Sequence, residues 1–407
     1  MKRSEKRGAN VIVIGAGIVG MAAAYFLRSA GHSVTVLDAD TPMAGATGAS
    51  DGAVSVASKK PGVMMVLAKA ARDFYVQLEA DGLLRDLFHR RPTFMFARNE
   101  LEANVLAAHG ADLAKADVQV DELTVSEFAR RIPGVSRNVV SVLAVPGDGH
   151  ALGYQIVAHL LKLSDVTVVR HARAKRVRVE NGKAVGVETD SGFFCGDAVL
   201  VAAGLGSADL VGLGNFICPR KGQIIITDRE KDNEPALEGP LMSAAYLAAK
   251  RNFEASRKNP ISLVIDPLRT GQFLIGGTRE EGVDSRTTTA HYVSEILRQA
   301  MDIYPAMGRR RVIRTFSGVR TATVDGLPVV GFHPAITNVF VATGFEGDGI
   351  CLGPLIGKTS ASLMTGKQVD LDIASLSPSR FVSREGTDEP QPTAAADETI
   401  NAATTGA

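Results

Sequence analysis

The segment that most constrains the fold is 11–38, which reads VIVIGAGIVGMAAAYFLRSAGHSVTVLD. An apolar run enters a glycine-rich turn, a helical pattern follows, and a second apolar run ends at Asp38. This order is typical of a β-α-β unit that binds a dinucleotide, because the strand, the helix and the acidic residue all stand where such a motif needs them. A glycine-rich turn in an α/β domain without a nucleotide is the ordinary alternative.

Each glycine of this motif has a separate physical role. Gly15 allows the tight turn between strand and helix, Gly17 lets the backbone approach a pyrophosphate, and Gly20 lets the helix pack closely on the strand. The free N–H groups at the start of the helix, near Ile18, would then face the phosphates. Asp38 is placed to accept hydrogen bonds from an adenosine ribose.

Length and composition limit the function classes. A chain of 407 residues exceeds a single compact core, so we expect two lobes. A net charge of +1 argues against nucleic acid as the main partner, and no apolar stretch approaches the ~18 residues of a membrane span. The 3 cysteines and 8 histidines lack metal-ligand or disulfide spacing, which predicts no metal and a reducing cytoplasm.

Two further strands end in glycine. The first, 199–204, runs through Ala203 into Gly204, where small residues again allow a close backbone approach. The second segment, 339–357, reads VFVATGFEGDGICLGPLIG, and its glycines are followed by a helical pattern from about Ile350. The N-terminus of such a helix stabilises negative charge, as develops on a reduced flavin ring. An ordinary crossover between a strand and a helix remains the alternative for each segment.

Arg320 lies just before this segment, between an apolar strand and a turn. Its planar guanidinium suits bidentate binding of a carboxylate. A surface arginine or a structural ion pair is the simpler interpretation of the same residue.

Together these motifs resemble the FAD-dependent amine and amino-acid oxidoreductases of the D-amino-acid oxidase superfamily. Within it, the resemblance is greatest to glycine oxidase, hydrogen cyanide synthase and the flavin subunits of opine and hydroxyproline dehydrogenases. It spans most of 9–368 and is strongest at 11–38, 197–204 and 314–357. The family's arginine-x-x-x-x-aspartate-glycine-x-proline pattern falls on Arg320, Asp325, Gly326 and Pro328.

Several positions depart from the family pattern. The ribose-binding acid is aspartate rather than glutamate, Thr321 stands where proline is common, and Phe345 and Glu346 replace a histidine or tyrosine. Gly318 occupies the position of the cysteine that attaches flavin in monomeric sarcosine oxidases, so the resemblance implies FAD bound without a covalent link. Cys351 lies near the expected flavin edge, but small buried cysteines are common.

The resemblance implies an α/β fold, with an FAD-binding Rossmann-like domain and a second α+β substrate domain on a mainly antiparallel sheet. The FAD domain would be discontinuous, formed by 9–60, 141–215 and 320–372, and the substrate domain would comprise 61–140 and 216–319. The composition of 377–407 predicts a disordered tail. Periodicity predicts helices over 63–80, 99–113, 289–303 and 350–364, strands over 94–97, 139–145 and 242–249, and a hairpin at Asn181-Gly182.

The implied reaction removes a hydride from the α carbon of a small amino acid or N-substituted amino acid, giving an imine. The substrate would be a D-amino acid, a cyclic imino acid such as D-hydroxyproline, or an opine. Arg320 would bind its carboxylate, Tyr246 would contact it, and His150 would border the site. A packed tyrosine and a hydrogen-bonded loop histidine are the structural alternatives. The cofactor-binding candidates are Gly15, Gly17, Ile18, Gly20, Asp38, Gly48, Ala49, Ser50, Val177, Ala203, Gly204, Gly344, Gly347, Asp348, Gly349 and Ile350.

Three other functions fit parts of the pattern. One is flavin-dependent oxidation of a 2-hydroxy acid or glycerol phosphate, where Arg320 would serve equally. Another is a role mainly within a complex, because the resemblance includes subunits that occur beside a second flavin subunit and a small iron–sulfur subunit. Such a complex would be cytoplasmic, with peripheral attachment to the inner membrane as an option. The third is a nicotinamide-dependent dehydrogenase, which an FAD absorption band would exclude.

Overall fold

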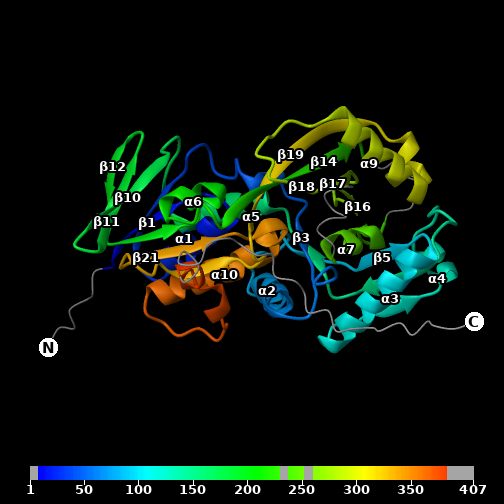
Figure 1. Ribbon diagram of the computed structural model, residues 1–407, viewed down its shortest axis with the longest axis horizontal. Coiled ribbons are helices and arrows are strands. Elements are labelled where there is room, and N and C mark those ends of the chain that lie inside the picture. Colours follow the sequence, from blue (N-terminus) through cyan, green and yellow to red (C-terminus); the bar gives the residue numbers. More distant parts are fainter. Residues whose placement is uncertain (1–7, 230–236, 252–259, 383–407) are drawn as a thin grey trace, which may run out of the picture.

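A computed structural model describes residues 8–229, 237–251 and 260–382. The chain forms two lobes side by side along the long axis of the molecule (Figure 1). One lobe contains a mostly parallel sheet of six strands, and the other is built on a larger, mainly antiparallel sheet of nine. The expected fold class is therefore confirmed.

The six-stranded sheet, in the order β20-β21-β13-β1-β2-β9, carries the N-terminal motif. Its parallel strands are β1 (Asn10–Ile14), β2 (Ser33–Leu37), β9 (Thr167–Val169), β13 (Ala198–Val201) and β21 (Val339–Thr343), and β20 (Val329–Phe332) joins the edge antiparallel. β1 lies in the middle of the sheet, with β2 and β9 on one side and β13 and β21 on the other. The direction in which strands are added therefore reverses at β1. In open α/β sheets, ligands bind at the carboxyl ends of strands at such a reversal.

Helices cover this sheet, and a small hairpin sheet extends it. The helices are α1 (Ile18–Ser29), α2 (Val63–Ala80), α5 (Gly153–Ser164), α6 (Ser207–Leu210), α10 (Gly349–Met364) and α11 (Ser379–Val382). α1 packs against α5 and α10, and α2 packs against α10. Small sheets are formed by β10 (Ala174–Glu180), β11 (Lys183–Thr189) and β12 (Gly192–Cys195), and by β3 (Ala53–Val54), β4 (His89–Arg90) and β8 (Gly149–His150). The predicted turn at Asn181 and Gly182 joins β10 to β11 with positive φ at both residues.

The nine-stranded sheet forms the second lobe. Its strands are β5 (Thr93–Ala97), β6 (Asp121–Leu123), β7 (Ser141–Val145), β14 (Ile217–Thr227), β15 (Leu241–Ser243), β16 (Ile261–Pro267), β17 (Phe273–Thr278), β18 (Glu280–Glu281) and β19 (Val312–Thr323). Its helices are α3 (Glu100–Lys115), α4 (Val125–Arg131), α7 (Ala244–Arg251) and α9 (Ala290–Ile303). The long pair β14 and β19 brings Arg320 into this sheet.

Strand pairing shifts two of the expected lobe boundaries. β7 pairs with β5, so 141–145 belongs to the nine-stranded sheet, and β19 runs unbroken through the expected boundary at 320. Conversely, α2 docks on the nucleotide lobe, where the Tyr75 hydroxyl donates to the Ile350 carbonyl at 2.7 Å. These boundaries depend on pairing between distant segments, which local patterns do not reveal.

Two local predictions were wrong over part of their range. A strand was expected over 242–249, but the chain turns into α7 at Ala244, where the Ser243 hydroxyl accepts the Ala245 N–H at 3.1 Å. A disordered tail was expected from 377, but residues up to 382 belong to the folded body. There Phe381 is buried against Phe216, and Arg380 forms an ion pair with Asp325 at 2.8 Å. The remainder, 383–407, lies outside the described residues.

Candidate functional site

The carboxyl ends of the parallel strands surround a cavity of about 570 Å³, here called the nucleotide cavity. The predicted residues that line it are Gly15, Gly17, Ile18, Asp38, Ala203, Gly204, Gly344 and Gly349. They follow β1, β2, β13 and β21, so segments far apart in the sequence converge at one edge of the sheet. This convergence is the arrangement expected of a dinucleotide site.

The turn after β1 requires glycine for steric reasons. Gly15 has φ of 106°, and a Cβ there would lie 2.3 Å from the Ala202 carbonyl oxygen. A Cβ on Gly20 would lie 2.0 Å from the Gly15 carbonyl oxygen, which explains why it packs in the turn without lining the cavity. A Cβ on Gly17 would meet only the Thr47 hydroxyl, at 3.2 Å, and Gly17 itself lines the cavity. Its backbone is therefore open to a ligand, as a pyrophosphate requires.

Asp38 accepts two hydrogen bonds from the backbone, and its side chain is still half-buried rather than enclosed. One carboxylate oxygen accepts the Ala16 N–H at 2.7 Å and the other accepts the Asp40 N–H at 2.9 Å, which fixes the side chain beside the glycine turn. A carboxylate has about four acceptor positions, so the group retains capacity for ribose hydroxyls. Asp38 is therefore placed to bind the ribose of an adenosine.

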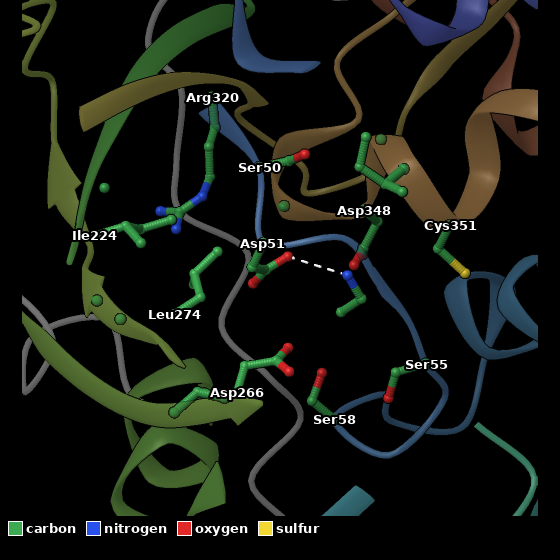
Figure 2. A pocket seen from close by; sticks show the side chains of 18 of the residues that line it. Ser50, Asp51, Ser55, Ser58, Ile224, Asp266, Leu274, Arg320, Asp348 and Cys351 are labelled. Atoms are coloured by element: carbon green, nitrogen blue, oxygen red, sulfur yellow. Dashed lines mark hydrogen bonds between the residues drawn. The ribbon is translucent and has the colours of Figure 1, made fainter. Parts of the chain in front are cut away.

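A second cavity, of about 170 Å³, lies between the two lobes and is here called the substrate cavity (Figure 2). The predicted residues that line it are Ile18, Ala49, Ser50, Tyr246, Arg320, Gly347, Asp348, Gly349 and Ile350. Ile18, Thr47 and Gly349 line both cavities, so the two adjoin. A group with a nucleotide end and a flat redox-active end fits this pair of spaces.

Arg320 reaches the substrate cavity from β19. Its guanidinium lies over Gly222 of β14, where a Cβ would come within 2.6 Å of Nη2, and Nη1 donates to the Thr278 carbonyl at 3.3 Å. Among the described residues it forms no ion pair. The absence of a side chain at Gly222 leaves room for this guanidinium, which keeps donors for an anionic ligand.

A buried ion pair lies at the start of α10. The Lys59 ammonium contacts an Asp348 carboxylate oxygen at 2.5 Å, with both side chains largely buried. Burial favours the neutral amine, but Asp348 outweighs it and raises the pKa of Lys59 above its usual value. Lys59 therefore stays protonated near the expected flavin edge.

A second buried ion pair closes the opposite end of the substrate cavity. Arg91 contacts Asp266 at 2.5 Å and donates to the Pro267 carbonyl at 2.6 Å. Burial raises the pKa of Asp266, and the Arg91 charge opposes this shift. Figure 2 shows Asp266 below the apolar wall that Ile224 and Leu274 form beneath Arg320.

Four charged residues join the lobes beside this cavity. Arg220 contacts Glu281 at 2.6 Å and Glu346 at 3.2 Å, and Arg279 contacts each of these glutamates at 3.5 Å. Glu346 lies in the glycine segment after β21 with φ of 47°. The cluster therefore ties the antiparallel sheet to the segment that leads into α10.

Three of the other predicted residues lie behind the cavity walls. His150 pairs β8 with β3, and its Nε2 lies 2.9 Å from the Asp51 carbonyl; burial lowers the pKa of His150 to about 3, so the ring is neutral. Gly48 packs against the Met43 carbonyl, which a Cβ would approach to 2.3 Å. Val177 is buried in the core of the hairpin sheet.

Cys351 lines the substrate cavity as a buried thiol. Burial is the largest cause of the rise in its pKa to about 12, which the Lys59 charge only partly opposes. A thiol in this state is a poor nucleophile near neutral pH.

Sequence reasoning missed several side chains that line these cavities, among them Thr47, Asp51, Lys59, Arg91 and Asp266. The Thr47 hydroxyl accepts the Ile18 N–H at 3.1 Å, at the start of α1. No local signal identifies such a contact, because its partner lies 29 positions away. The described residues contain no cluster of three metal ligands, and none of their helices is long and apolar enough to cross a bilayer.

Comparisons with known proteins agree with this geometry. Residues 10–363 match the family model described as FAD dependent oxidoreductase. The chain is 26% identical over 400 residues to a glycine oxidase of Geobacillus kaustophilus, covering 93% of this chain and 98% of that one. It is 27% identical over 388 residues to the uncharacterized oxidoreductase YurR of Bacillus subtilis, covering 90% of this chain and 98% of that one.

Solved structures show the same architecture. A glycine oxidase from Bacillus cereus superposes with a TM-score of 0.78 at 25% identity, covering 89% of this chain and 96% of the other. An L-proline dehydrogenase from P. horikoshii superposes with a TM-score of 0.79 at 20% identity, covering 93% and 99%. At that identity the second likeness concerns the fold alone.

Proposed function

Because the chain belongs to the family of FAD-dependent oxidoreductases, we propose that it oxidises a small amino acid or N-substituted amino acid. The hydrogen on the α carbon leaves as hydride, and the resulting imine is hydrolysed by water. A D-amino acid, a cyclic imino acid such as D-hydroxyproline, and an opine are the substrates that we favour. Relatives named glycine oxidase support the amino-acid class.

The observation that carries this proposal is the position of Arg320. It is a guanidinium in the substrate cavity that forms no ion pair among the described residues. Its fork matches the two oxygens of a carboxylate. Tyr246 lines the same cavity and would contact the same end of the substrate. His150 takes no direct part, because the walls of the cavity separate it from a ligand.

Bound FAD would supply the acceptor for the hydride. The nucleotide cavity would hold its adenosine and pyrophosphate through Asp38 and the N–H groups near Gly17. The N-terminus of α10, with Gly347 and Gly349, would stabilise negative charge on the ring. The protein then acts mainly by orienting the substrate, with Arg320 fixing its carboxylate and the apolar wall at Ile224 and Leu274 excluding water.

We propose a non-covalent flavin. A side chain at Gly318 would meet Ala49, since a Cβ there would lie 2.7 Å from the Ala49 Cβ. The raised pKa of Cys351 also disfavours attachment through that thiol. Acid precipitation of the protein should release FAD into the supernatant. Yellow colour that stays in the washed pellet would contradict this assignment.

The substrate class is tested by flavin bleaching without oxygen. The holoprotein is mixed with a panel of D-amino acids, cyclic imino acids, opines, 2-hydroxy acids and glycerol phosphate. We expect loss of the oxidised flavin band with the nitrogen-bearing compounds alone. Bleaching only by 2-hydroxy acids or glycerol phosphate would overturn the proposal and favour an alcohol donor.

We also propose that a partner subunit, rather than oxygen, accepts the electrons. The support is resemblance: the loop over 48–58 and the Tyr246 segment are similar to opine and hydroxyproline dehydrogenase subunits. A second flavin subunit and a small iron–sulfur subunit in the cytoplasm, peripheral to the inner membrane, are the partners implied. After substrate reduction, the isolated protein should reoxidise quickly with an artificial dye and slowly in air. Rapid reoxidation in air with stoichiometric peroxide would identify an oxidase instead.

A further inference from the structure

The charged side chains that line the substrate cavity nearly all pair with each other. Among the described residues there are four cations, Lys59, Arg91, Arg279 and Arg320, and four anions, Asp51, Asp266, Glu346 and Asp348. Three pairs form between them: Lys59 with Asp348, Arg91 with Asp266, and Arg279 with Glu346. Within the described part of the chain, this leaves Arg320 and Asp51 without an ion-pair partner.

These two residues approach the cavity from opposite lobes. Arg320 extends from β19 of the antiparallel sheet, whereas Asp51 lies in the loop that leads into β3. Both residues line the substrate cavity together with Ile224 and Leu274, and Figure 2 shows Arg320 reaching down beside Ile224 while Asp51 lies between Leu274 and Asp348. The unpaired charges of the site are therefore one guanidinium and one carboxylate, separated by an apolar surface.

The backbone holds Asp51 firmly in this position. One carboxylate oxygen accepts the Ala53 N–H at 3.2 Å, and the Asp51 carbonyl accepts the His150 Nε2–H at 2.9 Å. Gly52 follows with φ of 85°, and a Cβ there would lie 2.7 Å from both the His150 ring and the Ala151 carbonyl. The Ala151 N–H in turn donates to the Gly52 carbonyl at 2.8 Å. A carboxylate fixed in this way loses little conformational entropy when it binds a ligand.

We infer that Asp51 binds the positively charged nitrogen of the substrate while Arg320 binds its carboxylate, and that the ammonium passes a proton to Asp51 before the hydride leaves, so that the nitrogen lone pair can form the imine. Removing either charge of the ligand would leave the opposite protein charge partly buried and unpaired, which is costly. The site thus selects zwitterions over simple carboxylates, and neutral His150 is a positioning residue that acts through the Asp51 backbone. This inference rests on the proposed function, since it concerns the same substrate.

The test uses two ligands of nearly equal shape that differ in charge. Trimethylglycine carries a permanent cation and has no nitrogen lone pair to assist hydride loss, and 3,3-dimethylbutanoate replaces its nitrogen by carbon. Dissociation constants are measured on the oxidised holoprotein from the change in flavin absorbance. We expect the wild-type protein to prefer trimethylglycine by about tenfold or more, the scale of one charged contact.

Asp51→Asn should abolish most of this preference while leaving 3,3-dimethylbutanoate bound as before or more tightly. Asparagine can still accept the Ala53 N–H, so flavin content and melting temperature serve as checks that the loop is intact. Arg320→Lys should weaken both ligands. Asp117→Asn, at a fully exposed position, is the matched control and should change neither constant.

Three outcomes would overturn the inference: a wild-type protein without preference, a preference that survives in Asp51→Asn, or equal weakening of both ligands in that variant. The last would show that Asp51 supports the shape of the site or the flavin instead. Bleaching of the wild-type flavin by amino acids is measured separately. If amino acids reduce the flavin and the preference survives, only the assignment of Asp51 fails, whereas reduction by none of them would refute the proposed function itself.

Discussion

At the scale of single residues, the two glycines of the first turn separate folding from cofactor binding. A side chain on Gly15 collides with the Ala202 carbonyl and also meets an unfavourable φ of 106°. Gly17 has no such backbone neighbour, since only the Thr47 hydroxyl lies near its Cβ position, at 3.2 Å. The same motif therefore contains one glycine that the fold needs and one that the ligand needs.

Gly17→Val should consequently preserve the fold and lose the flavin. The added side chain would occupy space beside the start of α1, where the pyrophosphate needs the backbone. We expect at least a tenfold loss of bound FAD with little change in the circular dichroism spectrum. Gly15→Ala is the comparison variant and should impair folding itself. A Gly17→Val protein that keeps stoichiometric flavin would show that the cofactor does not approach this turn.

Arg320→Lys tests the carboxylate contact. Lysine keeps the charge but loses the bidentate fork, so substrate binding should weaken by about 1.5–3 kcal/mol, the range for hydrogen bonds to charged groups. The measurement is the substrate dependence of the flavin reduction rate without oxygen. Arg176→Lys, at an exposed pair with Glu188, is the control. An unchanged substrate dependence in Arg320→Lys would remove this residue from the site.

At the scale of elements, Asp148 fixes the loop that carries Ser55 onto the antiparallel sheet. Its fully buried carboxylate accepts hydrogen bonds from the Ser55 hydroxyl at 2.5 Å, the Val56 N–H at 2.9 Å and the Thr93 hydroxyl at 2.7 Å. Burial raises the pKa of Asp148, and these three donors oppose the shift. Because Ser55 and Thr93 both line the substrate cavity, this carboxylate sets the shape of the site from behind its wall.

Asp148→Ala should destabilise the protein by about 2–4 kcal/mol, because it leaves three donors without their acceptor. The free energy of unfolding is obtained from urea denaturation followed by circular dichroism and by flavin fluorescence. Loss of flavin should precede loss of helix, since the loop borders the cavity. Asp81→Ala, at an exposed helix end, should change the free energy by less than about 0.5 kcal/mol. Equal stability of the two variants would show that the buried network is dispensable.

Elements differ in how well the sequence predicts them. The helices over 63–80 and 350–364 have strong periodicity, and the structure begins and ends them within a residue of the expected positions. The segment over 242–249 was expected as a strand, but the strand ends at Ser243, and a helix starts there because the Ser243 hydroxyl accepts the Ala245 N–H. The glycines of the nucleotide cavity were predictable because their chemistry is local. Asp51 and Lys59 were not, because their partners come from distant segments.

At the scale of the whole molecule, the two lobes share their boundary elements. β19 delivers Arg320 from the antiparallel sheet, and the chain then returns through β20 and β21 to the parallel sheet. The cluster formed by Arg220, Arg279, Glu281 and Glu346 crosses the same junction. A substrate cavity between the lobes therefore depends on contacts from both, and no single segment of sequence contains it.

The C-terminal end of the folded body supports this junction from outside. Phe381 is 1% exposed and stacks on Phe216, and Arg380 pairs with Asp325 in the turn that follows β19. The Arg380 guanidinium also donates to the Leu327 carbonyl at 2.9 Å. Asp325 belongs to the segment between Arg320 and the glycine-rich turn, so residues near 380 hold a part of the chain that leads into the site.

Two truncations distinguish this contact from the rest of the C-terminus. Truncation after Asp372 removes Phe381 and Arg380, and we expect it to cost about 2–4 kcal/mol of stability, as for loss of a buried aromatic side chain and a charged contact. It should also lower flavin content, because the turn at Asp325 is released.

Truncation after Val382 keeps both contacts, and the removed residues, 383–407, have little apolar surface to bury. We expect that variant to match the full chain in melting temperature and flavin content. If both truncations leave the two quantities unchanged, the contacts of Arg380 and Phe381 contribute nothing to the site, and if both lower them, residues after 382 also stabilise the body.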